Sequence, residues 1–159
     1  MHIADLNIGG ETGLVSIEVE KGTTLLPLGG QHPRIKYTDE AGYVILIDKK
    51  YEYEKGRSRI VYIGTTKNGF SRVAQSAAAW ADDIFALRGV REFEVRIITC
   101  QPRRNLMTWR ILERALLLQF REQYGEIPAA NTQGKNISER GEFRVFSRNR
   151  IQRVLEDLT

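Results

Sequence analysis

Glu113 is the acidic residue whose surroundings most clearly suggest chemistry. It lies in the segment 107–124, between an apolar stripe that contains Trp109 and Phe120 and a stripe of arginines. Burying a carboxylate costs free energy unless a cation or a hydrogen-bond donor compensates its charge, and a metal ion is one such cation. The alternative is an ion pair on the helix surface with a neighbouring arginine. The arginines of this segment are Arg110, Arg114 and Arg121.

Histidine and cysteine are too scarce to support most other mechanisms. The chain has two histidines, His2 and His32, and one cysteine, Cys100. A serine-histidine-aspartate triad or a histidine-ligated metal would have to use residues outside the strongly patterned parts of the chain. An internal disulfide or a cysteine-based zinc site needs more cysteines. We therefore expect a reducing, cytoplasmic environment.

The distribution of charge favours an acidic partner. The chain has 159 residues and a formal net charge of +4. Residues 1–40 contain six acidic and three basic residues, whereas residues 41–159 contain 14 acidic and 21 basic residues. Basic surfaces bind nucleic-acid phosphates because each neutralised phosphate releases condensed counterions. The apolar runs are far shorter than the ~20 residues that cross a bilayer, so we expect no membrane segment.

The hydrophobic pattern predicts a single domain, residues 1–159, of the α+β class. Alternating or β-branched runs predict strands at 13–20, 35–38, 42–48, 58–64, 93–100 and 143–146. Apolar residues spaced three and four apart predict helices at 70–89, 107–124 and 148–158. The charged stretch 49–57 predicts a long solvated connection between two antiparallel strands. The result is a small central antiparallel sheet flanked by helices, with a β-β-α-β-α core.

Five short motifs, taken in order, resemble those of the GIY-YIG endonuclease superfamily. They are Gly42-Tyr43-Val44, Tyr62-Ile63-Gly64, Arg72, Glu113 and Asn131. Each motif is a weak signal alone, and the specificity comes from their order and from the strand or helix that carries each one. The predicted β-β-α-β-α order agrees with the core of that family. The resemblance covers residues 41–133, which leaves 1–40 as an N-terminal β extension and 134–159 as a C-terminal extension.

The resemblance implies a metal-dependent endonuclease that hydrolyses DNA phosphodiester bonds. It assigns one divalent ion, Mg²⁺ with Mn²⁺ as a substitute, to Glu113, and the scissile phosphate to Arg72, whose guanidinium can hold two oxygens. Tyr62 would position or deprotonate the attacking water. Its phenol, with an ordinary pKa near ~10, needs positive charge nearby for that role, and Lys67 or Arg72 would supply it. Asn131 would close the site by hydrogen bonding.

The same resemblance assigns structural and binding roles to further residues. Gly42 and Gly64 are the structural glycines of the two tripeptides, and Tyr43 is a further catalytic candidate. The partner is DNA, bound through its phosphate backbone. The expected phosphate contacts are Lys67, Arg110, Arg114, Arg121 and Lys135. The sequence indicates neither a target nor an oligomeric state.

The chain departs from the family pattern at two positions. The first tripeptide ends in Val44 where the family usually has tyrosine, and counting back from Asp48 places Val44, not Tyr43, in the tyrosine position. A shift of one residue turns a side chain to the other face of a sheet, so Tyr43 would need a bulge to reach the site. Ser76 stands where the family often has histidine or another basic residue, and Gln75 and Lys67 are the candidate replacements.

Two other interpretations use the same chain differently. Asp48-x-Lys50, with Asp39 or Glu40 upstream, has the acid, acid-x-lysine arrangement of another class of metal-dependent nucleases. It leaves Tyr62, Arg72 and Glu113 without a role. The second alternative is a catalytically impaired nucleic-acid-binding or structural module of the same fold, which the valine and serine substitutions favour.

Overall fold

The protein forms one five-stranded antiparallel sheet with helices on both faces. The computed structural model describes residues 3–5, 14–20, 41–67, 69–98 and 103–159. The strands are β1 (Ile3–Asp5), β2 (Leu14–Glu20), β3 (Ala41–Tyr53), β4 (Gly56–Thr66) and β5 (Glu92–Ile98), in the spatial order β1-β2-β5-β3-β4. The helices are α1 (Gly69–Ala86), α2 (Thr108–Tyr124), α3 (Glu142–Val145) and α4 (Arg148–Asp157). The predicted α+β class and β-β-α-β-α core are confirmed.

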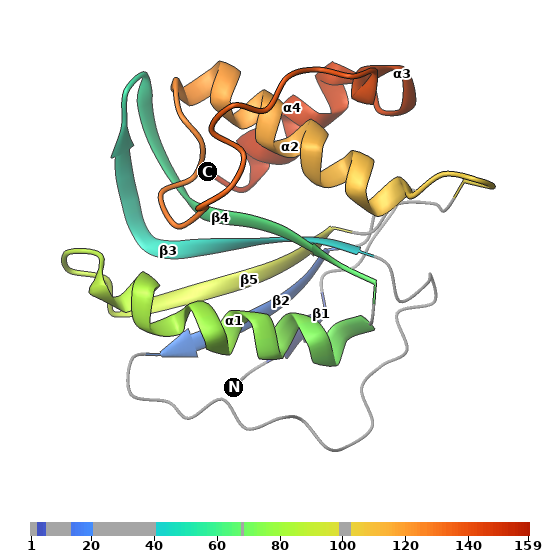
Figure 1. The fold of residues 1–159 in the computed structure, drawn as a ribbon. Helices are drawn as coiled ribbons and strands as arrows, with labels where there is room; N and C mark the ends of the chain where they lie inside the picture. Colours follow the sequence, from blue (N-terminus) through green and yellow to red (C-terminus); the bar gives the residue numbers. More distant parts are fainter. Residues whose placement is uncertain (1–2, 6–13, 21–40, 68, 99–102) are drawn as a thin grey trace.

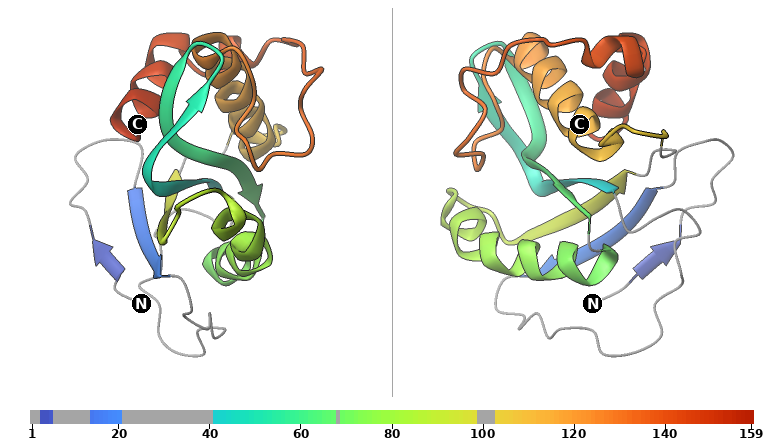
Figure 2. Two further views of the ribbon diagram at one scale, coloured as in Figure 1. Left: turned by 90° about the vertical axis from the view of Figure 1, so that its left-hand side faces the viewer. Right: turned by 45° about the vertical axis from the view of Figure 1, so that its right-hand side comes forward.

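The sheet separates two hydrophobic cores. Helix α1 covers one face, and α2 with α4 covers the other (Figure 1), as the side view in Figure 2 also shows. Strand β3 sends alternate side chains to the two sides, which is why its first seven residues are all buried and read as one continuous apolar run. The α1-side core includes Tyr43, Ile45, Ile47, Val73, Ala77, Ile84 and Val95. The α2-side core includes Val44, Leu46, Leu112, Leu116 and Phe120.

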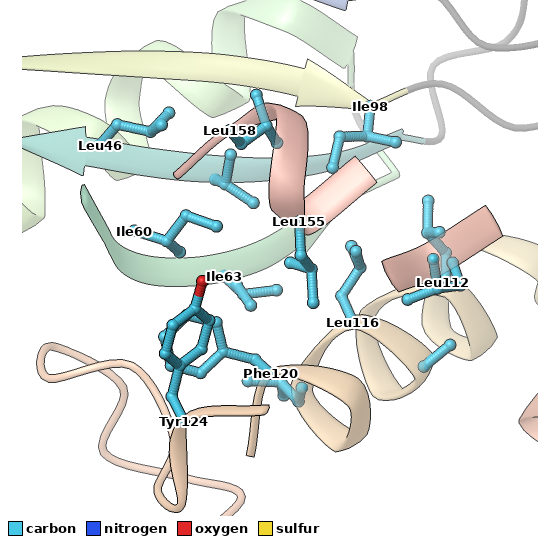
Figure 3. Close-up of a cluster of buried hydrophobic side chains, with 14 of the residues drawn as sticks. Leu46, Ile60, Ile63, Ile98, Leu112, Leu116, Phe120, Tyr124, Leu155 and Leu158 are labelled. Carbon is cyan, nitrogen blue, oxygen red and sulfur yellow. The ribbon is translucent and has the colours of Figure 1, made fainter. Parts of the chain in front are cut away.

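The C-terminal segment is part of the α2-side core. Figure 3 shows Leu155 beside Leu116 of α2, and Leu158 belongs to the same cluster as Ile60 and Ile63 of β4. Leu155 is completely buried, and Leu158 is 4% exposed. Complete burial of a leucine side chain stabilises a fold by about 2 kcal/mol. The segment predicted as a C-terminal extension therefore helps to hold α2 against the sheet.

The β3–β4 hairpin is longer than predicted. The solvated connection expected at 49–57 is wrong, because both strands continue and only Glu54 and Lys55 form the turn. The register shifts between Ile45 and Tyr51, and the end of the hairpin bends toward α2 (Figure 2). There the Tyr53 ring packs edge-on against the Phe120 ring, with 5.1 Å between the ring centroids. Aromatic packing thus stabilises an extension whose charged sequence had suggested a loop.

Other predicted elements have mixed outcomes. The strand predicted at 143–146 is wrong: a backbone hydrogen bond from Phe146 to Glu142 closes the single turn of α3. Short apolar runs fit a turn of helix as well as a strand. The strand predicted at 35–38 lies outside the described residues, and β1 was not predicted. No helix in the described part of the chain is long and apolar enough to span a membrane.

The hydroxyl of Tyr53 connects three segments, which gives a test of the hairpin packing. It donates to the carbonyl of Ile60 at 2.6 Å and accepts from the amide of Ala129 at 3.2 Å. Because both partners lose a buried bond, we expect Tyr53→Phe to lower the free energy of unfolding by about 2 kcal/mol. Denaturant unfolding measures this change. The matched control is Tyr51→Phe, on the neighbouring half-buried ring, and an equal loss there would contradict the bridging role of Tyr53.

Candidate functional site

An open groove lies along the β4 edge of the sheet. It has a volume of about 940 Å³ and is bounded by β4, α2 and the segment 131–140, with Trp80 of α1 also in its wall. Tyr62, Glu113 and Asn131 all line it, together with Arg110, Arg114 and Lys135. The groove therefore brings together three of the five motif residues and three of the five predicted phosphate contacts.

Side chains from both faces of the sheet meet in this groove because β4 is the edge strand. Tyr62 packs with the α1-side core, whereas Thr65 donates a hydrogen bond from its Oγ1 to Glu113 Oε2 of α2 at 3.1 Å. Within a strand, residues three apart point to opposite faces. At an edge strand, side chains from both faces can extend past the strand into the same groove. A central strand would separate these groups by the thickness of the sheet.

The carboxylate of Glu113 is half-buried and incompletely compensated. Burial raises its pKa above that of an ordinary glutamate. The hydrogen bond from Thr65 and the charges of Arg110 and Arg114 act in the opposite direction but do not cancel the effect of burial. The ion pair with a helix arginine that the sequence left open does not form in the described structure. Glu113 therefore retains capacity for a cation.

The oxygen atoms around Glu113 fit a magnesium ion held mainly by water and substrate. Among the described residues, no three histidine, cysteine, aspartate or glutamate side chains come together as a metal-binding group. Mg²⁺ prefers oxygen ligands and is commonly held by one or two carboxylates, several waters and phosphate oxygens. Glu113 supplies one such carboxylate and Thr65 a nearby hydroxyl. This donor set suits Mg²⁺ or Mn²⁺ only when a phosphate completes it.

Tyr43 lies on the same side of the sheet as Tyr62, and Val44 lies on the opposite side. Val44 is completely buried in the α2-side core, whereas Tyr43 lies on the α1 side with its ring centroid 5.7 Å from that of Tyr62. Which of the two fills the tyrosine position of the family pattern stays a prediction, but Tyr43, not Val44, lies on the same side of the sheet as Tyr62. In the pairing of β3 with β4, Tyr43 lies opposite Gly64 and Ile45 opposite Tyr62, so these side chains share one face. The register shift comes after Ile45, and no bulge is needed to turn Tyr43 toward Tyr62.

The two tyrosines belong to a short hydrogen-bonded chain. Ser76 hydrogen-bonds to Tyr43, Tyr43 to Tyr62, and Trp80 to Tyr62. Since the indole nitrogen is only a donor, the Tyr62 oxygen accepts from Trp80. Ser76, which replaces the basic residue of the family pattern, thus has a defined partner. The rings of Tyr43 and Trp80 also pack against the Tyr62 ring, with 5.7 Å and 5.0 Å between centroids.

Tyr62 remains protonated near neutral pH. Burial raises its pKa; the hydrogen bonds from Tyr43 and Trp80 lower it, and the nearby charge of Glu113 raises it further. The net direction is upward. Lys67 and Arg72 are not among the groups that lower the pKa of Tyr62, contrary to the expectation from the sequence. Tyr62 is suited to donate a hydrogen bond rather than to remove a proton.

Arg72 lies apart from the groove. Its side chain is exposed on α1, one turn before Ser76, and its Nη1 donates to Gln75 Oε1 at 3.3 Å. Arg72 is not among the groove-lining residues. Lys67 is exposed just after the end of β4 and does not line the groove either. Neither Arg72 nor the first tripeptide lines the groove with Glu113, although Tyr43 of that tripeptide packs against Tyr62.

Asn131 fixes one wall of the groove. Its side-chain oxygen accepts from the Ile63 amide at 2.9 Å, and its side-chain nitrogen donates to the Ile63 carbonyl at 2.9 Å. The Ala130 amide adds a bond to the Val61 carbonyl at 2.8 Å. These bonds satisfy backbone groups along the β4 edge. Asn131 thus acts on the backbone of the edge strand, and through it on the position of segment 131–140.

Two of the predicted phosphate-binding arginines instead bond to the segment 135–142 beside the groove. Arg114 pairs through Nε with Glu142 Oε1 at 2.5 Å and donates to the Ser138 carbonyl at 2.7 Å. Arg121 donates to the Lys135 carbonyl at 3.1 Å. Arg110 is exposed, with its guanidinium 4.9 Å from the Trp109 ring centroid. Arg110 is therefore the one of the three with no backbone carbonyl or carboxylate partner in the described bonds.

The sequence did not predict the part played by Glu142 or Trp80. Glu142 lies next to a segment predicted as a strand, and no local pattern indicates that it pairs with Arg114 across 28 residues. Trp80 lies within the helix predicted at 70–89. Its spacing gave no sign that the ring reaches the groove. Both roles arise from tertiary contacts.

The rival acid-x-lysine arrangement lies outside the groove. Asp48 lies within β3 rather than in a loop, and its nearest charged partner is Arg91, with Asp48 Oδ2 3.9 Å from Arg91 Nε. Lys50 is exposed, and neither residue lines the groove. Asp39 and Glu40 lie outside the described residues. Comparison with known proteins finds no matching family model, no matching curated protein and no matching solved structure.

Gly64 provides a test of the tyrosine arrangement. A Cβ atom at this position would lie 2.6 Å from Tyr62 Cε1 and 2.9 Å from Tyr43 Cζ. We expect Gly64→Ala to lower the free energy of unfolding by about 2 kcal/mol, because the packed rings have to move. The control is Gly42→Ala, whose Cβ would have its closest contact with the flexible end of Leu112, at 3.1 Å, and should cost less. Equal losses in denaturant unfolding would show that the rings do not restrict Gly64.

The ion pair of Arg114 with Glu142 gives a prediction for pH dependence. Burial tends to raise the pKa of Glu142, but hydrogen bonds from the Arg140 amide and from Arg114 outweigh it and hold the pKa below its usual range. We expect Glu142→Gln to lower stability at pH 7 by about 3 kcal/mol. A lowered pKa means that this contribution is complete at neutral pH and shrinks as the pH falls below the ordinary glutamate value of about 4.3.

Denaturant unfolding at a series of pH values measures this effect. The difference in unfolding free energy between the unmodified chain and Glu142→Gln should be constant from neutral to weakly acidic pH and should then decrease. Glu139→Gln is the matched control, since Glu139 pairs with Arg148 at the exposed surface. A difference that grows toward low pH would contradict the assignment.

Proposed function

We propose that the protein is a divalent-metal-dependent endonuclease that hydrolyses DNA phosphodiester bonds by a GIY-YIG-type mechanism. The observation that carries the proposal is the incompletely compensated carboxylate of Glu113, in an open groove that it shares with Tyr62 and Asn131. These residues were selected from the order of motifs alone. Their meeting at one place supports the idea that they act together. A cytoplasmic location, where nucleic acid is available, is part of the same proposal.

The chemistry divides between an ion and the side chains of the groove. When bound, a divalent ion would stabilise the negative charge that develops on the phosphate. Glu113 would hold that ion through its carboxylate. Tyr62, which stays protonated, would donate a hydrogen bond from its fixed hydroxyl to a phosphate oxygen or to the attacking water. Tyr43 and Trp80 would keep that hydroxyl in position.

The basic residues of the groove suit a phosphate backbone. Arg110, Lys135 and Arg140 line it and are exposed. Arg114 also lines it, but its charge is matched by Glu142. We therefore assign phosphate contacts to Arg110 and Lys135, and we assign Arg114 and Arg121 mainly to the support of segment 135–142. Lys67 remains a candidate for DNA outside the groove.

A non-catalytic nucleic-acid-binding module is the second candidate, and the position of Arg72 favours it. A guanidinium that stabilises the transition state has to reach the scissile phosphate. Arg72 is exposed, bonds to Gln75 and lies outside the groove. Under the nuclease proposal, bound DNA would extend from the groove across the start of α1 to reach it. Under the alternative, Arg72 has no catalytic task.

Substitution of Glu113 tests the proposal. We expect Glu113→Gln to abolish magnesium-dependent nicking of supercoiled DNA, because an amide cannot replace the charge that holds the ion. The protein should still fold and bind DNA, since removing a costly buried charge does not weaken the groove. Gel analysis of plasmid DNA with magnesium, with manganese and with a chelator measures cleavage. A fluorescence-anisotropy titration measures binding.

The control separates this mechanism from its rivals. Asp48→Asn changes a carboxylate outside the groove and should leave the cleavage rate near that of the unmodified chain. Cleavage that survives Glu113→Gln but not Asp48→Asn would contradict the proposed site and favour the acid-x-lysine arrangement. DNA binding without cleavage under all metal conditions would favour the non-catalytic module.

A further inference from the structure

The groove is much larger than a phosphate and an ion require. Its volume of about 940 Å³ lies toward the upper end of the 300–1,000 Å³ or so that is usual for clefts that bind small organic molecules. Glu113 and Tyr62 account for only part of its lining. The rest of the lining includes Trp80 on α1 and the segment 132–138. Apart from Trp80 and Lys135, this part of the groove has no role in the proposed hydrolysis.

Trp80 presents a fixed aromatic ring to the groove. It is half-buried, whereas Val73, Ala77 and Ile84 of the same helix are at most 2% exposed. The Trp80 ring lies 5.0 Å from the Tyr62 ring, between centroids, at an angle of 36°. Its indole also interacts with the Tyr62 hydroxyl. Tyr62 and Trp80 thus form an ordered aromatic pair directly beside the proposed phosphate site.

The segment across the groove supplies neutral polar groups. Thr132, Gln133 and Asn136 are exposed and line the groove. Amide and hydroxyl side chains can both donate and accept hydrogen bonds, as the edges of nucleobases require. Arg110 and Lys135 add positive charge for the attached phosphate. Aromatic rings, neutral polar groups and cations in one groove match the three chemical parts of a nucleotide.

We propose that the groove binds one unpaired nucleotide of the DNA strand, with its base stacked on the Tyr62–Trp80 pair and its phosphate next to Glu113. A base held in a duplex is already stacked on its neighbours and cannot stack on a side chain. Unpaired bases stack on aromatic side chains in single-strand-binding proteins. The inference rests on the proposed nuclease function and narrows its substrate to DNA with an unpaired nucleotide at the cut.

Tryptophan fluorescence reports directly on this subsite. The chain has two tryptophans, Trp80 and Trp109, so Trp109→Phe leaves Trp80 as the single reporter. The probes are a short oligothymidylate and an abasic oligomer with the same number of phosphates, both added with a chelator present so that no cleavage occurs. We expect the oligothymidylate to quench Trp80 emission and to bind about tenfold more tightly than the abasic oligomer.

Two substitutions separate stacking from a general effect on folding. Trp80→Leu should remove the preference for the oligomer with bases, while the abasic oligomer still binds through Arg110 and Lys135. That retained binding shows that the groove is intact. Trp80→Phe keeps an aromatic ring and loses only the indole donor, so it should keep most of the preference.

The outcomes also distinguish this subsite from the function on which it rests. Equal affinity for the two oligomers, with no quenching, would overturn the nucleotide subsite; magnesium-dependent cleavage of plasmid DNA by the same preparation would then leave the nuclease proposal standing. A preference for bases that survives Trp80→Leu would also overturn the subsite. If neither oligomer binds and plasmid DNA is not cleaved, both proposals are wrong.

Discussion

The edge of strand β4 is the constraint on which the candidate site depends. An edge strand leaves backbone donors and acceptors without strand partners, and some other segment has to satisfy them. Here Asn131 and Ala130 do so, by bonding to Ile63 and Val61. The same bonds carry the chain over the end of the sheet and place segment 131–140 opposite α2. The groove is thus a consequence of covering this edge.

Two glutamates beside the groove show how charge is distributed around it. Glu142 is almost completely buried, yet its pKa is held low because Arg114 and a backbone amide bond to it. Glu113 is less buried, yet its pKa is raised. Burial raises it, and the hydrogen bond from Thr65 and the nearby arginines offset that effect only in part. The arginine adjacent to Glu113 in sequence pairs with the other acid. Only Glu113 therefore gains from an additional cation, and it faces open space.

The sequence predicted what depends on local pattern. Periodicity located the central strands and the three longer helices, and motif order selected Glu113 and Tyr62, which the structure brings together. Tertiary packing decided the rest. The charged end of the hairpin stays extended because Tyr53 packs on α2, which no local pattern indicates. The sheet face that Tyr43 shares with Tyr62 follows from the pairing of β3 with β4, which a count along one strand does not include. The position of Trp80 required knowledge of where α1 crosses the sheet.

The most direct test of the account is the pKa of the Glu113 carboxyl group, measured by carbon-detected NMR and assigned with Glu113→Gln. In the presence of a chelator, the account predicts a pKa above the ordinary glutamate value of about 4.3. Adding magnesium together with a short DNA oligonucleotide should lower that pKa, because the ion binds only the ionised carboxylate. A pKa that magnesium and DNA leave unchanged would contradict the claim that Glu113 holds the metal ion.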